Sequence, residues 1–204
     1  MLPRGELRAG LLGCLRQGRS GRKRRSRGQD RRGQIADMTS LHVRPPEVED
    51  RLIPGHWEGD LIKGAFNRSA VGTLVERSSR LVMLAQVEGA TAPAALEGFS
   101  RVLNGVPEPM RKSLTYDQGK EMSEHQRLTE RTGVAVFFAD PHSPWQRGSN
   151  ENTNGLLRQY FPKRSEIAHY TQADLDAVAA ELNERPRQTL GWRSPSQALD
   201  EAMR

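Results

Sequence analysis

Alternating and continuous apolar runs in the middle of the chain predict β-strands. Three such runs follow one another between residues 56 and 87 with short polar turns between them, a pattern typical of an antiparallel meander. Two shorter apolar runs farther along predict two more strands. The five predicted strands are His56–Lys63, Ala70–Glu76, Arg80–Val87, Lys112–Asp117 and Val134–Ala139.

Helical patterns alternate with the later strands. Thr91 can cap a helix that runs to about Leu103 and ends at Gly105. Further helices are expected at Glu121–Arg131, at about Ser149–Tyr160, from Thr171 to Asn183 and after Ser194, the last two opened by capping boxes with Asp174 and Gln197. This order predicts a mixed α/β fold in which helices cover a sheet that starts antiparallel.

Charge divides the chain into two parts. Residues 1–34 contain 11 of the 31 Lys and Arg residues but only 2 of the 25 Asp and Glu residues, a balance of +9, which leaves −3 for residues 35–204. Residues 1–43 are therefore predicted to form a basic, largely disordered arm and linker, and residues 44–204 one domain. Its folded part is expected to begin near Ile53, after the proline-containing linker Arg44–Glu49.

Composition excludes several classes of protein. The longest apolar runs are far shorter than the roughly 20 residues that a membrane-spanning helix needs, so no membrane association is expected. Cys14 is the only cysteine, which excludes an intrachain disulfide and a cysteine-based zinc site. The five histidines lie far apart in the sequence, and no secretory signal is recognisable, so a cytoplasmic protein is expected.

Acidic residues stand at the ends of predicted elements. Strand alternation places Glu58 and Asp60 on one face, and Gly59 between them allows close approach by other backbone. Asp117 ends an apolar strand before a glycine turn, and Glu151 opens a helix among asparagines. Each acid alone is explained as simply by a turn, a cap or an ion pair.

Together, these acids predict a metal site. Two acids on strand ends and one on a following helix can converge at one rim of the sheet. Such an oxygen-only cluster suits Mg²⁺ or Mn²⁺, and two ions about 4 Å apart can activate an attacking oxygen and stabilise a leaving oxygen at phosphorus. Glu58 competes with Asp60 for the role of first ligand because both face the same way.

Three motifs carry a resemblance to a known family. They are Pro54–Ile62 (PGHWEGDLI), Leu114–Met122 (LTYDQGKEM) and the long, specific Pro141–Lys163 (PHSPWQRGSNENTNGLLRQYFPK). The chain resembles bacterial DDE transposases of the insertion-sequence-thirty family over roughly residues 35–200. Asp117 and Glu151 show the 33-residue separation of that family. The resemblance implies an RNase H-like fold of the integrase catalytic core, with a mixed five-stranded sheet flanked by helices.

The resemblance also implies an activity. Asp60, Asp117 and Glu151 would be the catalytic triad and would bind two Mg²⁺ or Mn²⁺ ions. The implied reaction is cleavage of the DNA strand at an element end, followed by attack of the freed 3′-hydroxyl on target DNA. DNA at the element ends and at the target would be the partner of a homo-oligomer in the bacterial cytoplasm, associated with the nucleoid.

Basic and aromatic residues around the triad are candidates for DNA contact. Arg158, seven residues after Glu151, matches the basic residue that such transposases carry two helical turns beyond the acid. Arg147, Lys163 and Arg164 flank the acidic motifs and are candidate phosphate ligands, although an ordinary charged surface explains them equally well. The aromatic residues Trp145 and Trp192 are expected to pack, and the acids Glu121 and Asp140 to serve as helix-start and turn residues.

One departure from the family pattern leaves an alternative open. Family members carry a helix-turn-helix region before the core, whereas only about fifty residues precede the core here, so the chain is expected to be N-terminally truncated. The alternative function is that of a truncated, non-catalytic transposase remnant that regulates the full-length enzyme through oligomerisation. A nuclease that cuts RNA–DNA hybrids is a third possibility, against which the third motif argues.

Overall fold

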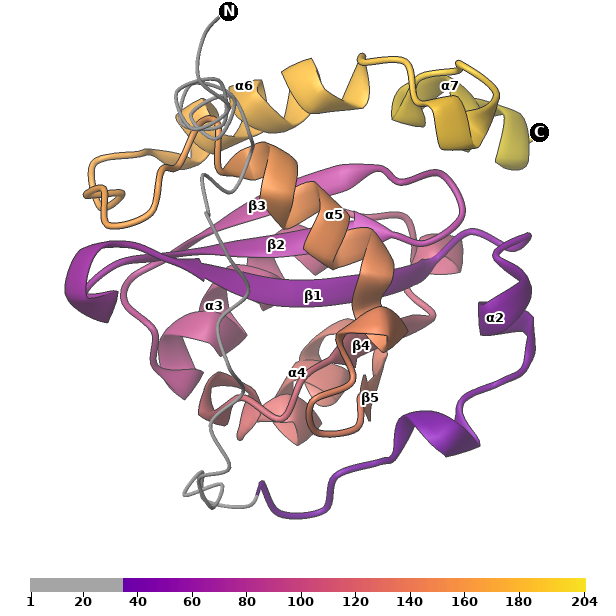
Figure 1. The fold of residues 1–204 in the computed structure, drawn as a ribbon. Coiled ribbons are helices and arrows are strands. Elements are labelled where there is room, and N and C mark those ends of the chain that lie inside the picture. Colours follow the sequence, from indigo (N-terminus) through magenta and orange to yellow (C-terminus); the bar gives the residue numbers. More distant parts are fainter. Residues whose placement is uncertain (1–34) are drawn as a thin grey trace, which may run out of the picture. The chain divides into compact units, whose positions relative to one another are not determined.

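A five-stranded mixed sheet organises the part of the chain that the computed structural model describes, residues 35–204 (Figure 1). The strand order is β3-β2-β1-β4-β5. The first three strands pair antiparallel, and β4 and β5 continue the sheet parallel to β1. The strands are β1 (His56–Lys63), β2 (Ala70–Glu76), β3 (Val82–Val87), β4 (Ser113–Tyr116) and β5 (Ala135–Phe138).

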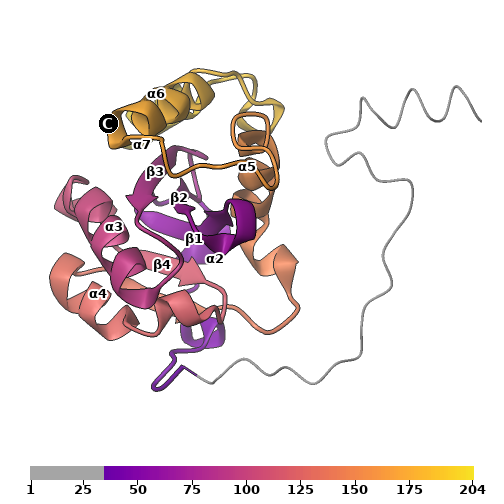
Figure 2. The same cartoon turned by 90° about the vertical axis from the view of Figure 1, so that its left-hand side faces the viewer.

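Helices cover both faces of this sheet (Figure 2). One core, which includes Trp57 and Phe99, packs between the sheet and α3 and α4. A second core, which includes Leu157 and Leu175, packs on the other face under α5 and α6. The helices are α2 (Glu47–Asp50), α3 (Ala92–Asn104), α4 (His125–Thr132), α5 (Gly148–Leu157), α6 (Gln172–Asn183) and α7 (Pro195–Ala202).

The predicted mixed α/β fold is therefore confirmed, including the antiparallel start of the sheet. The predicted caps are also present, because the Thr91 side chain accepts from Ala94 and both capping boxes form. The later strands are shorter than predicted by one or two residues at an end, and two helices also differ. A short 3-10 turn, Lys120–Met122, precedes α4, and α5 ends at Leu157 rather than near Tyr160.

The prediction that the folded part begins near Ile53 is wrong. Ile35 and Val48 are buried, and Phe138 of β5 donates its backbone N–H to the Thr39 carbonyl at 2.9 Å. Arg44, expected in a linker, is buried and donates to Thr115 Oγ1 at 2.7 Å. Packing that links positions about 70 to 100 residues apart leaves no local signal in the sequence. Residues 1–34 of the predicted arm lie outside the described residues.

Side chains of α6 occupy the outer edge of β3. The Asn183 amide accepts from the Val82 N–H at 2.8 Å and donates to the Val82 carbonyl at 2.9 Å. Gln172, at the other end of α6, accepts from the Gln86 N–H and donates to the Leu84 carbonyl. Two amide side chains thus take the place of a neighbouring strand. No helix within residues 35–204 is long and apolar enough to cross a membrane.

Candidate active site

Asp60 lies on β1, where strand alternation turns its side chain toward α5. One carboxylate oxygen accepts the Leu61 N–H at 2.9 Å, and the other accepts the Asn154 amide at 2.9 Å. Burial raises the pKa of Asp60 to about 6; the Arg147 guanidinium opposes this rise, and the Asp117 carboxylate adds to it. Asp60 therefore behaves as an acid poised near neutral pH.

Asp117 follows β4 and is joined to Asp60 by a shared guanidinium. Arg147 Nη2 lies 3.2 Å from Asp117 Oδ2, and Arg147 Nη1 lies 3.9 Å from Asp60 Oδ2. Nη1 also donates to the Gly59 carbonyl at 2.8 Å, beyond the last β1–β4 pair, Glu58 with Thr115. Arg147 thus bridges the two strands at the point where they separate and keeps both acids beside it.

Close packing explains two glycines at this site. A Cβ on Gly59 would lie 2.9 Å from a ring carbon of Tyr116 and 3.0 Å from a methyl carbon of Leu114. The space is thus filled by side chains rather than by the backbone that the sequence suggested. A Cβ on Gly119 would lie 2.7 Å from the Glu121 carboxylate and 2.9 Å from Asp117 Oδ1. Glycine therefore allows these two acidic side chains to approach the turn.

Glu121 is closer to the acid pair than the sequence indicated. It was expected to start a helix but lies in the 3-10 turn before α4, and its largely buried carboxylate lies 3.6 Å from Lys63 Nζ. Its charge raises the pKa of Asp60, although less than burial does. Only the glycine turn between Asp117 and Glu121 could have signalled this proximity in the sequence.

Glu151 is not brought into contact with the other two acids. It lies in the first turn of α5, where its side chain is exposed and makes no hydrogen bond or ion pair with another described residue. Within residues 35–204, no three His, Cys, Asp or Glu side chains lie close enough together to hold a metal ion. The structure therefore assembles Asp60 and Asp117, and leaves Glu151 at the rim on the neighbouring helix.

Two asparagines dock α5 onto β1. Asn150 Nδ2 donates to the Glu58 carbonyl at 2.9 Å, and Asn154, one helical turn later, donates to Asp60. Their four-residue spacing on the helix matches the two-residue spacing of Glu58 and Asp60 on the strand. Asn154 Oδ1 is buried without a hydrogen-bond partner among the described residues. This oxygen beside Asp60 is an acceptor available to a cation, a role that the sequence pattern did not predict.

Glu58, the alternative first ligand, has a structural role. Its side chain is fully buried, and Oε1 accepts from Arg77 Nη1 at 2.6 Å. Oε2 accepts the backbone N–H of Asn150 at 2.9 Å. Both oxygens are thus engaged by protein donors, which ties the start of α5 to the sheet. Asp60 is the better candidate ligand because it is less buried and faces Asp117 across Arg147.

The predicted DNA contacts fall into two groups. Arg147 is buried on the acid pair and not presented to solvent. Arg158 is half-buried and donates to the Phe161 carbonyl, and burial lowers its pKa although the charge of Asp60 opposes this. Lys163 and Arg164 have exposed side chains, as a phosphate ligand requires.

Two tryptophans were predicted to pack, and both predictions are wrong. Trp145 and Trp192 are each 70% exposed. Trp145 lies in a 3-10 turn, Pro144–Arg147, whose preceding loop is held by the pair of hydrogen bonds between Asp140 and Gln146. Asp140 thus acts as the turn residue that was expected. The turn holds Arg147 in its buried position and leaves the Trp145 side chain exposed to solvent.

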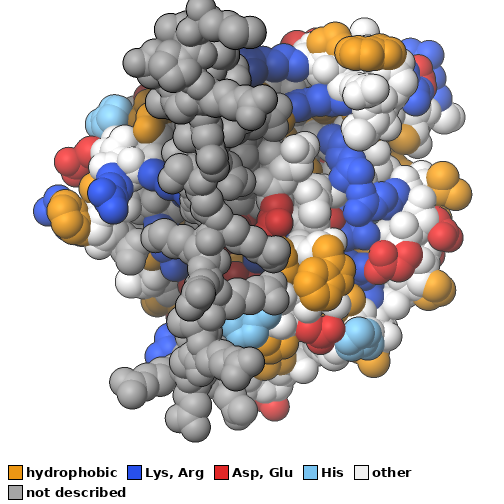
Figure 3. Space-filling model, in the orientation of Figure 1, with side chains coloured by type: hydrophobic (Ala, Val, Ile, Leu, Met, Phe, Trp, Pro, Cys, Tyr) orange, Lys and Arg blue, Asp and Glu red, His pale blue; other side chains and the backbone are white. Residues whose placement is uncertain are grey.

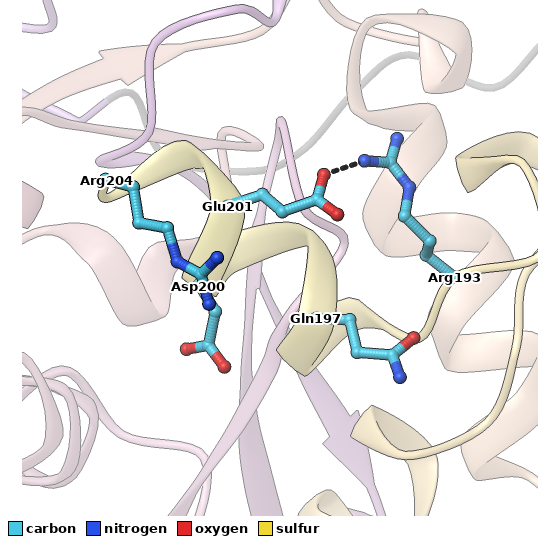
Figure 4. A pocket seen from close by; sticks show the side chains of 5 residues that line it. All are labelled: Arg193, Gln197, Asp200, Glu201 and Arg204. Carbon is cyan, nitrogen blue, oxygen red and sulfur yellow. Dashed lines mark hydrogen bonds and ion pairs between the residues drawn. The ribbon is translucent and has the colours of Figure 1, made fainter.

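A hollow of about 360 Å³ lies elsewhere, against α7 (Figure 4). Five polar side chains line it, with Arg193 paired to Glu201 across one side: Arg193, Gln197, Asp200, Glu201 and Arg204. None of the predicted site residues reaches this hollow, which is therefore separate from the acid pair.

Comparison with known proteins identifies the core. Residues 52–144 match the family model described as the integrase core domain. The chain is 62% identical over 201 residues to the transposase for insertion sequence element IS1086 of Cupriavidus metallidurans, covering 98% of this chain and 59% of the relative. It is 44% identical over 182 residues to transposase InsI for insertion sequence element IS30A of Escherichia coli, covering 89% and 47% respectively. The chain thus spans about half to three fifths of these relatives.

Solved structures support the fold alone. The catalytic core domain of BIV integrase superposes with a TM-score of 0.55 at 19% identity, covering 73% of this chain and 95% of that chain. A chain of the simian T-cell lymphotropic virus intasome in complex with a PP2A regulatory subunit superposes with a TM-score of 0.56 at 20% identity, covering 79% and 58%. These neighbours confirm the predicted RNase H-like architecture.

Proposed function

Because this chain belongs to the insertion-sequence-thirty (IS30) family of transposases and has an integrase-type core, we propose that it catalyses metal-dependent DNA strand cleavage and strand transfer. Asp60, Asp117 and Glu151 are the proposed catalytic triad. DNA at the element ends and at the target is the proposed substrate, bound by a homo-oligomer. The observation that carries this proposal is the convergence of Asp60 and Asp117 on Arg147, beside the helix that carries Glu151.

The donor set fits hard divalent cations. Two carboxylates share one rim, and the buried Asn154 Oδ1 beside them has no hydrogen-bond partner among the described residues. Mg²⁺ and Mn²⁺ prefer such oxygen ligands. Asp60 and Asp117 would hold the ions together with Glu151. When bound, two divalent ions would activate the attacking oxygen and neutralise the charge that develops at phosphorus.

The chain's own residues supply positioning and charge. Arg147 keeps the two carboxylates at a fixed separation, and Asn154 orients the Asp60 oxygen that faces α5. Glu151 is the exposed partner in this proposal: it has no existing contact to break, so it could join the acid pair when divalent ions neutralise the charges of the three carboxylates. Exposed Lys163 and Arg164 at the end of this segment would contact the DNA backbone.

The regulator alternative is less favoured. A remnant under no selection for chemistry has no reason to keep all three acids, and here two of them converge with a bridging arginine and a docked asparagine. Those contacts are what a phosphoryl-transfer site needs for preorganisation.

A branched DNA that mimics one element end already joined to target tests the proposal. Reversal of strand transfer on this substrate needs active-site chemistry but little end recognition. We would compare the wild-type chain with Asp117→Asn and Glu151→Gln in Mg²⁺ or Mn²⁺. Glu130→Gln, an exposed acid on α4 at the other face of the sheet, is the matched control.

Resolution by the wild type and the control, and loss by the two triad variants, is the expected result. A folded wild-type chain that resolves nothing at saturating metal would refute the enzymatic proposal. Full activity of Glu151→Gln would instead refute the assignment of Glu151 and leave the enzyme in place.

A further inference from the structure

Two arginines outside the acid pair converge on one hydroxyl. Arg51, just after α2, and Arg80, in the β2–β3 turn, both donate to Ser149 Oγ in the first turn of α5, the former at 3.3 Å. Ser149 Oγ is the only described acceptor within hydrogen-bond reach of either guanidinium. Each guanidinium carries five N–H donors, so most of them are left for another ligand.

Neither of these two guanidiniums forms an ion pair within the described part of the chain, unlike two neighbouring arginines. Four arginines gather here, and two of them are neutralised: Arg44 pairs with Glu49, and Arg77 pairs with Glu58 and Glu49. No carboxylate in the described part of the chain lies within ion-pair distance of Arg51 or Arg80. Burial lowers the pKa of Arg80 and the charge of Arg51 lowers it further, whereas the charges of Glu58 and Glu76 oppose this fall without contacting the guanidinium. The pair therefore repels itself around a neutral hydroxyl.

The backbone conformation at both positions is unusual for a residue with a long side chain. Arg51 has φ 55° and Arg80 has φ 63°. This left-handed region favours glycine or asparagine over a long side chain. Local folding therefore does not explain why both positions carry arginine, whereas a ligand of opposite charge would.

We infer that Arg51, Arg80 and Ser149 form a binding site for a backbone phosphate of DNA. A phosphodiester offers the negative charge that the pair lacks, and its oxygens match the planar donor fork of a guanidinium. The hydroxyl of Ser149 supplies a further donor once its hydrogen turns to the ligand. This inference rests on the proposed function, because it assumes that DNA reaches α5.

The site lies on the opposite flank of α5 from the acid pair. Ser149 and Glu151 are two positions apart, so their side chains leave the helix about 200° apart. Asn154, which contacts Asp60, is on the flank of Glu151. Lys and Arg side chains form a band across the face that carries α5 (Figure 3). A DNA strand crossing the start of this helix would be held on one flank while the acids act on the other.

Salt-dependent DNA binding tests the site. We would measure binding of a fluorescent 20-base-pair duplex by anisotropy from 50 to 300 mM KCl without divalent metal. The proteins are the complete chain, Arg51→Gln, Arg80→Gln and their double variant. Arg101→Gln/Arg204→Gln, which removes two exposed arginines elsewhere, is the charge-matched control. All variants contain residues 1–34, so any contribution of these residues is shared.

We expect the double variant to bind about tenfold more weakly at 100 mM KCl, and its slope of log K against log salt to fall by about 1, the value for one lost phosphate contact. The control should keep the wild-type slope. A double variant that behaves like the control overturns the inference and leaves the proposed function intact. A wild-type chain that binds no duplex overturns both.

Inorganic phosphate supplies a second readout that needs no DNA. Phosphate should raise the melting temperature of the wild type more than that of the double variant. The rise for the control should equal the rise for the wild type. An equal rise in all three proteins would contradict a built site. Arg51→Gln alone, which removes one part-buried hydrogen bond, serves the same comparison if the double variant does not fold.

Discussion

Arg147 holds Asp117 through a 3.2 Å ion pair while the same guanidinium donates to the backbone of β1. Replacing Arg147 with Gln leaves the Gly59 carbonyl without its donor and two acids without their shared cation. We expect a loss of about 2 kcal/mol in the free energy of unfolding, measured by urea denaturation without metal. Arg164→Gln, which removes an exposed arginine, should change it by less than about 0.5 kcal/mol.

Divalent metal should reverse part of this loss. Saturating Mg²⁺ supplies the missing positive charge, so Arg147→Gln should recover stability relative to the wild type when the titration is repeated with the ion. If the deficit is the same with and without Mg²⁺, then Arg147 supports the strands alone and does not balance the charge of the acids.

The pKa of Asp60 predicts how stability changes with pH. Its value of about 6 in the folded chain exceeds the ordinary 3.8. Well below pH 3.8, the carboxyl is protonated in both the folded and the unfolded chain, so it does not affect the free energy of unfolding. Between pH 4 and 6, the unfolded chain releases the proton first, so stability falls as the pH rises. Relative to the wild type, Asp60→Asn should gain about 2–3 kcal/mol between pH 4 and 7.

Urea denaturation of both proteins at several pH values measures this difference. Any constant cost of the amide, such as a rearranged contact with Asn154, cancels because only the change with pH is compared. A difference that stays flat across this range would show that Asp60 titrates at its ordinary value in the folded chain.

The affinity of the site for divalent metal should also depend on the protonation of Asp60. Ions bind the ionised carboxylate, so protons compete with them below the pKa of Asp60. Calorimetric titration with Mn²⁺ should give an apparent affinity about tenfold weaker at pH 5 than at pH 7. Asp60→Asn should bind weakly at both values. An affinity that does not change with pH would argue against Asp60 as a ligand.

Glu58 and Arg77 should behave as a buried structural pair. Glu58→Gln leaves the guanidinium of Arg77 largely uncompensated in the interior and should cost about 3 kcal/mol of stability. Glu58→Gln/Arg77→Gln should cost less than the sum of the two single changes, in a double-mutant cycle measured by urea denaturation. Mn²⁺ affinity per folded molecule should stay unchanged in Glu58→Gln. Loss of that affinity would restore Glu58 as a candidate ligand.

Local chemistry in the sequence predicted most of the fold. Side-chain caps such as Thr91 and the Thr171–Asp174 box act within four residues, and strand alternation separated Glu58 and Asp60 from the glycine between them. Such signals depend on neighbours along the chain, so they survive without knowledge of the tertiary structure.

Contacts between residues far apart in the sequence determine the features that could not be predicted. Arg44 was expected in a linker because its partner Thr115 is 71 residues away. Arg147 was expected to contact DNA because the sequence does not reveal that β1 and β4 separate beside it and leave the Gly59 carbonyl as its acceptor. Trp145 was expected to pack because a large apolar side chain usually does. The placement of each of these side chains depends on a partner, or the lack of one, far away in sequence.

The amide side chains on the edge of β3 have a consequence for how copies of this chain can meet. Asn183 and Gln172 already use the outward backbone groups of Val82, Leu84 and Gln86, and Thr39 takes the N–H of Phe138 at the opposite edge. A neighbouring molecule therefore finds few open backbone groups on which to add a strand. A homo-oligomer of the proposed kind would therefore join its copies through helices and loops, while each sheet stays closed to its neighbour.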